Sequence, residues 1–195
     1  RGGTLTIRGD AGSMLGAFQQ SGKTVVEKDV GDKAGFSMAG GEISIQGSTG
    51  DESGSSMTGG TLLVRGHSGD RLGSGMSGGS IVVMGSVGSE PGIGMTGGRI
   101  IISGSCPPPP DGVEMRSIKK SEISEFAKLL DPMGLSLNDD ALVLEPGDDT
   151  STRIEKSEDF ISEGFENISL YPNEDSLSNN APLDHYTLLV QDGSD

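Results

Sequence analysis

Hydrophobic and polar residues alternate in short stretches that return every nineteen residues through the first half of the chain. In the stretch that begins at Gly41, Ile43 and Ile45 are apolar, whereas Glu42 and Ser44 beside them are polar. Such alternation predicts a short half-buried strand. The two inward positions recur at Leu5 and Ile7, Thr24 and Val26, Leu62 and Val64, Ile81 and Val83, and Ile100 and Ile102.

Glycine and methionine occupy fixed places in each unit. Glycine is expected where the backbone needs a positive φ or where neighbouring backbones approach closely. Methionine is a flexible filler for an irregular core, which we favour over a cofactor-binding methionine cluster. The glycines that open the units are Gly3, Gly22, Gly41, Gly60, Gly79 and Gly98, those that end the strands include Gly47, Gly66 and Gly85, and the methionines are Met38, Met57, Met76 and Met95.

An ungapped repeat of this length predicts identical units stacked on one another. We therefore expect an all-β fold over residues 1–104, a right-handed parallel β-helix of about six nineteen-residue coils. The ends of such a stack present unpaired strand edges that must be capped or docked. The repeat lapses at Gln19, Thr24 and Lys28, which indicates a coil near an end or under a partner.

Residues 105–195 predict a small acidic α+β or partly disordered appendage that packs on the coils, as a cap for example. The prolines at 107–110 end the repeat and form an extended linker. A helix is expected at about 121–131, with Ser121 as its N-cap. Strands are expected at about 141–145 and 186–190, and the polar stretch between them predicts loop or disorder.

Charge separates the two parts of the chain. Residues 1–104 carry nine acidic and eight basic side chains, whereas residues 105–195 carry twenty and six, so −14 of the net charge of −15 belongs to the second part. An acidic protein of this kind is not expected to bind nucleic acid or anionic lipid. One cysteine allows no internal disulfide, and no stretch reaches the length of a membrane span. These features favour a cytoplasmic protein.

Two motif matches arise from the repeat itself. Gly73–Gly78 matches a dinucleotide-binding fingerprint, but a strand-like run follows it where a helix N-terminus is required. Gly75–Gly79 matches the serine-hydrolase elbow around Ser77, which needs a strand, a turn and then a helix. Nothing in the sequence places His67 or His185 beside Ser77, so an esterase is a remote alternative.

Metal binding has little support in the sequence. The aspartates Asp10, Asp32, Asp51 and Asp70 occur in only some units and are expected on a solvated outer turn. Cys106 and the two histidines lack the spacing of a metal site. The acidic run formed by Asp139, Asp140, Glu145, Asp148 and Asp149 could bind cations weakly, although such runs are more often solvated surface.

The unit Gly-Asp-x-Gly…Gly-x-x-Met-x-Gly-Gly-x-Ile-x-Ile-x-Gly, clearest over Gly41–Gly104, resembles the glycine-rich (GXGXG) β-helical subunit of formylmethanofuran dehydrogenase. The related formyltransferase/hydrolase subunit and the C-terminal domain of glutamate synthase share this pattern. The resemblance covers residues 1–104 and implies a β-helix that is not the catalytic element. It also implies partner subunits that hold a tungsten or molybdenum pterin and iron–sulfur clusters, in a complex that reduces carbon dioxide and attaches the formyl group to methanofuran.

The sequence therefore predicts a scaffold subunit, or a stand-alone relative, with no catalytic, cofactor-binding or metal-binding residue of its own. Its expected partners are other protein subunits of such a complex, or further copies of itself. A β-helix module of a glutamate synthase-like enzyme is the alternative.

Overall fold

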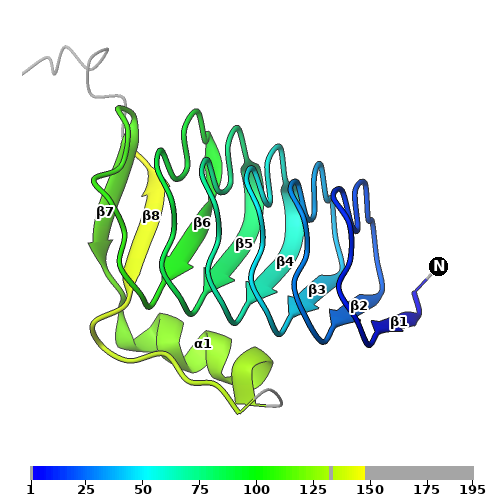
Figure 1. The fold of residues 1–195 in the computed structure, drawn as a ribbon. Helices are drawn as coiled ribbons and strands as arrows, with labels where there is room; N and C mark the ends of the chain where they lie inside the picture. The colour runs from blue at the N-terminus through cyan, green and yellow to red at the C-terminus, as the bar shows by residue number, and fades with distance from the viewer. Residues whose placement is uncertain (1, 132–133, 148–195) are drawn as a thin grey trace, which may run out of the picture. The chain divides into compact units, whose positions relative to one another are not determined.

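The computed structural model describes residues 2–131 and 134–147, and its first six strands follow the nineteen-residue repeat (Figure 1). Each strand pairs in parallel with the next, with partners nineteen residues apart, as Ile43 with Leu62 and Leu62 with Ile81. The strands are stacked coils of a parallel β-helix with about five complete turns, and the predicted fold is confirmed. They are β1 (Thr4–Ile7), β2 (Lys23–Val26), β3 (Glu42–Ile45), β4 (Thr58–Val64), β5 (Ser77–Val83) and β6 (Gly97–Ile102).

The interior of the stack is built from rows of equivalent side chains. Ile43, Leu62, Ile81 and Ile100 form one such row, and all four are fully buried. The methionines at 38, 57 and 76 are also fully buried, and Met95 is 5% exposed. Because each row places like side chains one coil apart, the core fills continuously along the stack, and burial of each side chain contributes about 1.5–3 kcal/mol.

Glycine serves two different purposes in this packing. Gly60, which opens a unit, has φ +84°, and its counterparts Gly41, Gly79 and Gly98 have φ between +81° and +89°. Gly66, which ends a strand, has no positive φ, but a Cβ there would lie 2.7 Å from the Gly47 carbonyl oxygen of the preceding coil. Glycine is therefore required at the unit-opening positions by backbone conformation as well as by close contact. At the strand-ending positions it is required by close contact alone.

The sheet continues past residue 104, where we expected the coil region to end. Its last strands are β7 (Val113–Ser117) and β8 (Leu142–Pro146), in the order β6-β8-β7. Strand β8 pairs antiparallel with both neighbours. The strand predicted at 141–145 is thus confirmed with a shift of one residue, while β7 was not predicted. The strand expected at 186–190 and the polar stretch after Gly147 lie outside the described residues.

Helix α1 (Lys120–Leu130) confirms the helix expected at about 121–131, but its predicted N-cap is wrong. Lys119, in extended conformation, holds that position instead of Ser121. The Lys119 backbone N–H donates a 2.8 Å hydrogen bond to Glu122 Oε2, which satisfies a donor at the helix start. The acidic residue expected in the first turn therefore fixes the helix start two residues earlier than Ser121.

Helix α1 covers the outer face of the later strands, so the expectation of half-buried strands is wrong for β4, β5 and β6 (Figure 1). Their outward residues Leu63, Val82 and Ile101 are at most 1% exposed and share a second core with Phe126 and Leu130. Strands buried on both faces carry continuous apolar runs. The runs at 62–64, 81–83 and 100–102 have this character.

Candidate functional site

Polar side chains on the outer turns form a row that links each coil to the next. Asp29 Oδ1 accepts a 2.7 Å hydrogen bond from the Ser48 N–H, one coil later. Ser48 Oγ accepts from the His67 N–H at 3.0 Å, and His67 Nδ1 accepts from the Ser86 N–H at 2.9 Å. Aspartate, serine and histidine thus perform one task at equivalent positions, which is to accept a backbone hydrogen bond from the following coil.

A second row runs three residues further along each coil. Asp32 Oδ1 accepts from the Asp51 N–H at 3.0 Å, Asp51 Oδ1 from the Asp70 N–H at 2.8 Å, and Asp70 Oδ1 from the Ser89 N–H at 2.7 Å. The aspartates are exposed, as the sequence predicted, but their carboxylates are committed to the backbone of the neighbouring coil. We call the two sets together the acceptor rows.

Glycine makes the acceptor rows possible. A Cβ at Gly50 would fall on Asp32 Oδ1 and lie 2.9 Å from the Asp32 backbone nitrogen. The same conflict recurs at Gly69 with Asp51 and at Gly88 with Asp70. The glycine directly before each donor residue therefore leaves space for the side chain that accepts the bond.

Among the residues that the structure describes, the other candidates form no catalytic arrangement. Ser77 is exposed at the start of β5 and is followed by strand, so the strand, turn and helix of a hydrolase elbow are not formed around it. The His67 backbone N–H donates to Ser48 Oγ, and His67 Nδ1 accepts from the Ser86 N–H. His185 lies outside the described residues. Among residues 2–131 and 134–147, no group of three or more His, Cys, Asp or Glu side chains could hold a metal ion.

Cys106 and the described part of the acidic run lie in surroundings that show no binding site. Cys106 packs partly buried against the core, and its burial raises the pKa of the thiol. Asp139 and Asp140 are exposed, whereas Glu145 binds Arg116, and Asp148 and Asp149 lie outside the described residues. The described residues among them therefore give no support for a metal-binding or catalytic site.

Two of the lapses in the repeat form a polar pair in the core near the first coil. Gln19 stands where later coils have methionine, and Thr24 stands where they have isoleucine or leucine. Thr24 Oγ1 donates a 3.0 Å hydrogen bond to Gln19 Oε1. Gln19 Nε2 donates to the backbone oxygens of Gly22 and Glu42, each at 3.2 Å. The two substitutions satisfy each other, which explains why polar residues are tolerated at these core positions.

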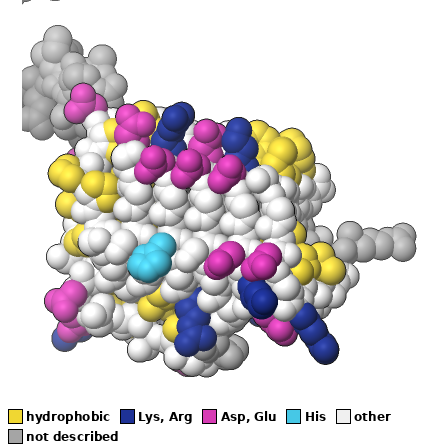
Figure 2. Space-filling view, viewed as in Figure 1, with side chains coloured by type: hydrophobic (Ala, Val, Ile, Leu, Met, Phe, Trp, Pro, Cys, Tyr) yellow, Lys and Arg dark blue, Asp and Glu magenta, His cyan; other side chains and the backbone are white. Residues whose placement is uncertain are grey.

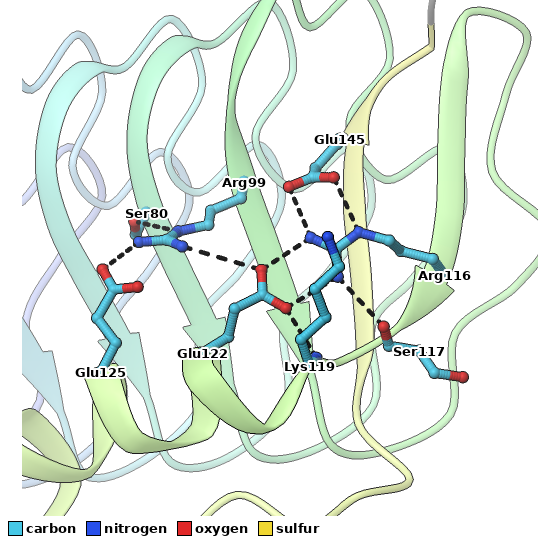
Figure 3. Close-up of polar contacts among 8 residues, drawn as sticks. All are labelled: Ser80, Arg99, Arg116, Ser117, Lys119, Glu122, Glu125 and Glu145. Carbon is cyan, nitrogen blue, oxygen red and sulfur yellow. Dashed lines mark hydrogen bonds and ion pairs between the residues drawn. The ribbon is translucent and has the colours of Figure 1, made fainter.

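A cluster of charges joins α1 to the last strands of the sheet, β6, β7 and β8 (Figure 3). Arg116 donates two hydrogen bonds to Glu122, of 2.7 and 2.9 Å, and two to Glu145, of 2.8 and 3.0 Å. Arg99 pairs with Glu122 at 3.9 Å and with Glu125, and its guanidinium lies 4.8 Å from the centre of the Phe126 ring. These hydrogen bonds, chiefly those from Arg116, lower the pKa of Glu122 to about 2 although burial opposes the shift.

The first coil carries the most exposed apolar surface. Leu5 is 53% exposed, Met14 46% and Phe18 62%, and the Phe18 ring meets Phe36 edge to face at 5.5 Å. Figure 2 shows hydrophobic side chains at both ends of the stack, in separate groups at the end that holds this coil. We call these three side chains, Leu5, Met14 and Phe18, the first-coil surface.

Strand β1 is the first strand of the sheet and pairs only with β2 in the described part of the chain. In the second coil, the N–H groups of Lys23 and Glu27 donate to the first coil, to the oxygens of Gly3 and Ile7. At the other end of the stack, Val113 and Leu144 close the core. The two ends of the described stack therefore differ in how far their apolar residues are exposed.

No family model and no curated protein matches this chain. No helix within the described ranges is long and apolar enough to cross a membrane. Assignment of a function therefore rests on the acceptor rows and on the pattern of the repeat.

Replacement of Gly50 by alanine should destabilise the protein by about 1–3 kcal/mol, because the new methyl group displaces the Asp32 carboxylate from its acceptor position. Gly12 is the matched control, since it occupies the same place in the first coil and a Cβ there meets nothing within 4 Å. Gly12→Ala should change stability by less than about 1 kcal/mol. Urea unfolding followed by circular dichroism compares the two, and equal stabilities would contradict the role of glycine beside the acceptor rows.

Replacement of Glu122 by glutamine should cost about 2–3 kcal/mol at pH 7, because Arg116 then loses a charged partner. A carboxyl group whose pKa is lowered on folding contributes stability above its unfolded pKa of about 4.3 and loses it as the pH falls toward 2. The difference between wild type and Glu122→Gln should therefore shrink across that range. Glu125→Gln, at the exposed end of the cluster, should cost less than about 1 kcal/mol. A pH-independent difference for Glu122 in denaturant titrations would contradict this explanation.

Proposed function

We propose that this chain is a non-catalytic scaffold module that contributes a rigid β-helix to an assembly of protein subunits. The observation that carries the proposal is the use of the polar outer-turn residues. Asp51, Ser48 and His67 accept backbone hydrogen bonds from the next coil instead of converging on a common point. General acid–base or nucleophilic chemistry needs such groups within reach of one another and of a substrate. Here they lie in rows along the stack and support its geometry.

In its specific form, the proposal is that the chain is the β-helical subunit of a formylmethanofuran dehydrogenase, or a relative of that subunit. The resemblance of Gly41–Gly104 suggests it, and the stacked coils are the architecture that the resemblance implies. On this proposal the protein is cytoplasmic. The tungsten or molybdenum pterin and the iron–sulfur clusters belong to partner subunits, and this chain supplies surfaces that hold those subunits together.

Purification of the complete protein from its native host, followed by mass spectrometry of everything that elutes with it, tests this proposal. The expected result is co-elution, in fixed stoichiometry, with a metallopterin-bearing subunit and an amidohydrolase-like subunit. Isolation with amidotransferase and flavin-binding subunits would overturn the specific form of the proposal. Isolation as a single chain with enzymatic activity of its own would overturn the scaffold role.

A further inference from the structure

One residue in the acceptor rows belongs to a type that changes its charge near neutral pH. The row that contains His67 is built otherwise from aspartate and serine, and its last described link is the 3.2 Å hydrogen bond from the Ser105 N–H to Ser86 Oγ. Histidine is the side chain whose charge ordinarily changes between pH 5 and 8. The acceptors of this row are Asp10, Asp29, Ser48, His67 and Ser86.

The direction of the His67 hydrogen bond requires a neutral imidazole. His67 Nδ1 accepts from the Ser86 N–H at 2.9 Å, and a ring nitrogen accepts only when it carries no proton. The neutral ring therefore has its proton on Nε2. A protonated imidazole carries N–H groups on both nitrogens, so two donors would face one another across the same 2.9 Å. Protonation thus removes this link between the two coils.

The ring lies too close to the next coil to adapt in place. A Cβ at Gly85 would lie 2.7 Å from His67 Nδ1, so the ring nitrogen uses the space that this glycine leaves. His67 is exposed, and Figure 2 shows the imidazole, in cyan, at the surface of the coils. A protonated ring can therefore turn away from the Ser86 N–H into water, where both of its nitrogens donate freely.

The interior beside this turn offers little apolar packing to replace the lost bond. Thr49 and Ser68 are 7% and 6% exposed, and their hydroxyl groups form a 3.1 Å hydrogen bond. The coils on either side have Val30 and Val87 at these positions. Because a hydroxyl side chain buries less apolar area than valine, the turn that holds His67 depends more on hydrogen bonds than its neighbours do.

The charged side chains around His67 are engaged elsewhere. Arg65 and Asp70 stand on the same coil, Asp51 on the coil before it and Asp29 two coils before it. The three carboxylates accept backbone N–H groups, and the arginine bonds to a glutamine side chain. The equivalent turn of the next coil carries no charged side chain. Within the described ranges none of these groups forms an ion pair with His67.

We propose that His67 is a pH-sensitive link between the coils that begin at Gly60 and Gly79. The neutral imidazole holds the outer turn of the second of these coils through the Ser86 N–H. On protonation the ring releases that amide, and the outer turn opens locally while the strands stay paired. The inference adds a response to acidification that the scaffold role does not include, and it does not depend on which subunits bind the chain.

Hydrogen exchange of the full chain at pH 8 and pH 5 tests the link. Protection is expressed relative to an unfolded amide at the same pH, which removes the intrinsic effect of pH on exchange. Protection of the Ser86 N–H should fall about tenfold at pH 5, as expected for a backbone donor that loses its partner. The His67 N–H, held by Ser48 Oγ, should keep its protection. Unchanged protection of Ser86, or an equal loss at both amides, would overturn the proposal.

Two substitutions separate titration from the presence of an acceptor. His67→Ser supplies the hydroxyl that Ser48 and Ser86 use at equivalent positions, so the Ser86 N–H should be protected equally at both pH values. His67→Ala supplies no acceptor, so protection should be low at both. The strand amides of β4 and β5 report that each variant is folded. A tenfold loss that persists in His67→Ser would assign the pH response to another group and overturn the proposal.

The ring itself gives an independent measurement. At pH 8 the nitrogen chemical shifts of His67, assigned by comparison with His67→Ser, should show the proton on Nε2. A proton on Nδ1 would contradict the hydrogen bond to the Ser86 N–H and overturn the proposal. None of these results bears on the scaffold role, which is judged by the subunits that co-elute with the native protein.

Discussion

A separation of nineteen residues between stacked neighbours is the constraint on which the rest of this structure depends. Because every coil has the same length, each backbone group finds its partner at the same place in the adjacent coil, and each core residue packs on its own equivalent. A change in coil length would shift strands, core rows and outer turns together. The regular core of isoleucine, leucine, valine and methionine is a consequence of this registration.

In the outer turns, side chains as well as backbone groups link each coil to the next. There the backbones pair only at isolated bridges, such as Thr49 with Ser68, and side chains accept part of the hydrogen bonds between coils. Asp51, Ser48 and His67 differ in charge and shape, yet each presents an acceptor to the N–H one coil later. Glycine before the donor leaves the space that these acceptors need. Residue types that suggest catalysis or metal binding in isolation therefore act here as structural links, which is the basis of the proposed scaffold role.

The strands and interior rows could be predicted from the sequence because they depend only on periodicity. The acceptor rows could not be predicted, because aspartate, serine and histidine are different residue types whose common role is visible only once the coils are stacked. Strand β7 carries two apolar residues, Val113 and Met115, beside the charged Glu114 and Arg116, so its signal is weak; its place is decided by pairing with β8 and by the hydrogen bonds of Arg116. Burial of the outward strand face depends on a helix that follows it in the chain. The apolar runs at 62–64, 81–83 and 100–102 were the available signal for that second core.

Hydrogen exchange tests the structural role of the acceptor rows most directly, because it reports each outer-turn amide separately. We predict that the N–H groups of Ser48, Asp51, His67 and Asp70 are protected to an extent similar to the strand amides of β4 and β5, although all four residues lie outside the strands. Exchange of these amides at the rate of freely exposed loop amides, with β4 and β5 still protected, would contradict that role. In that case the strands alone would hold the coils together.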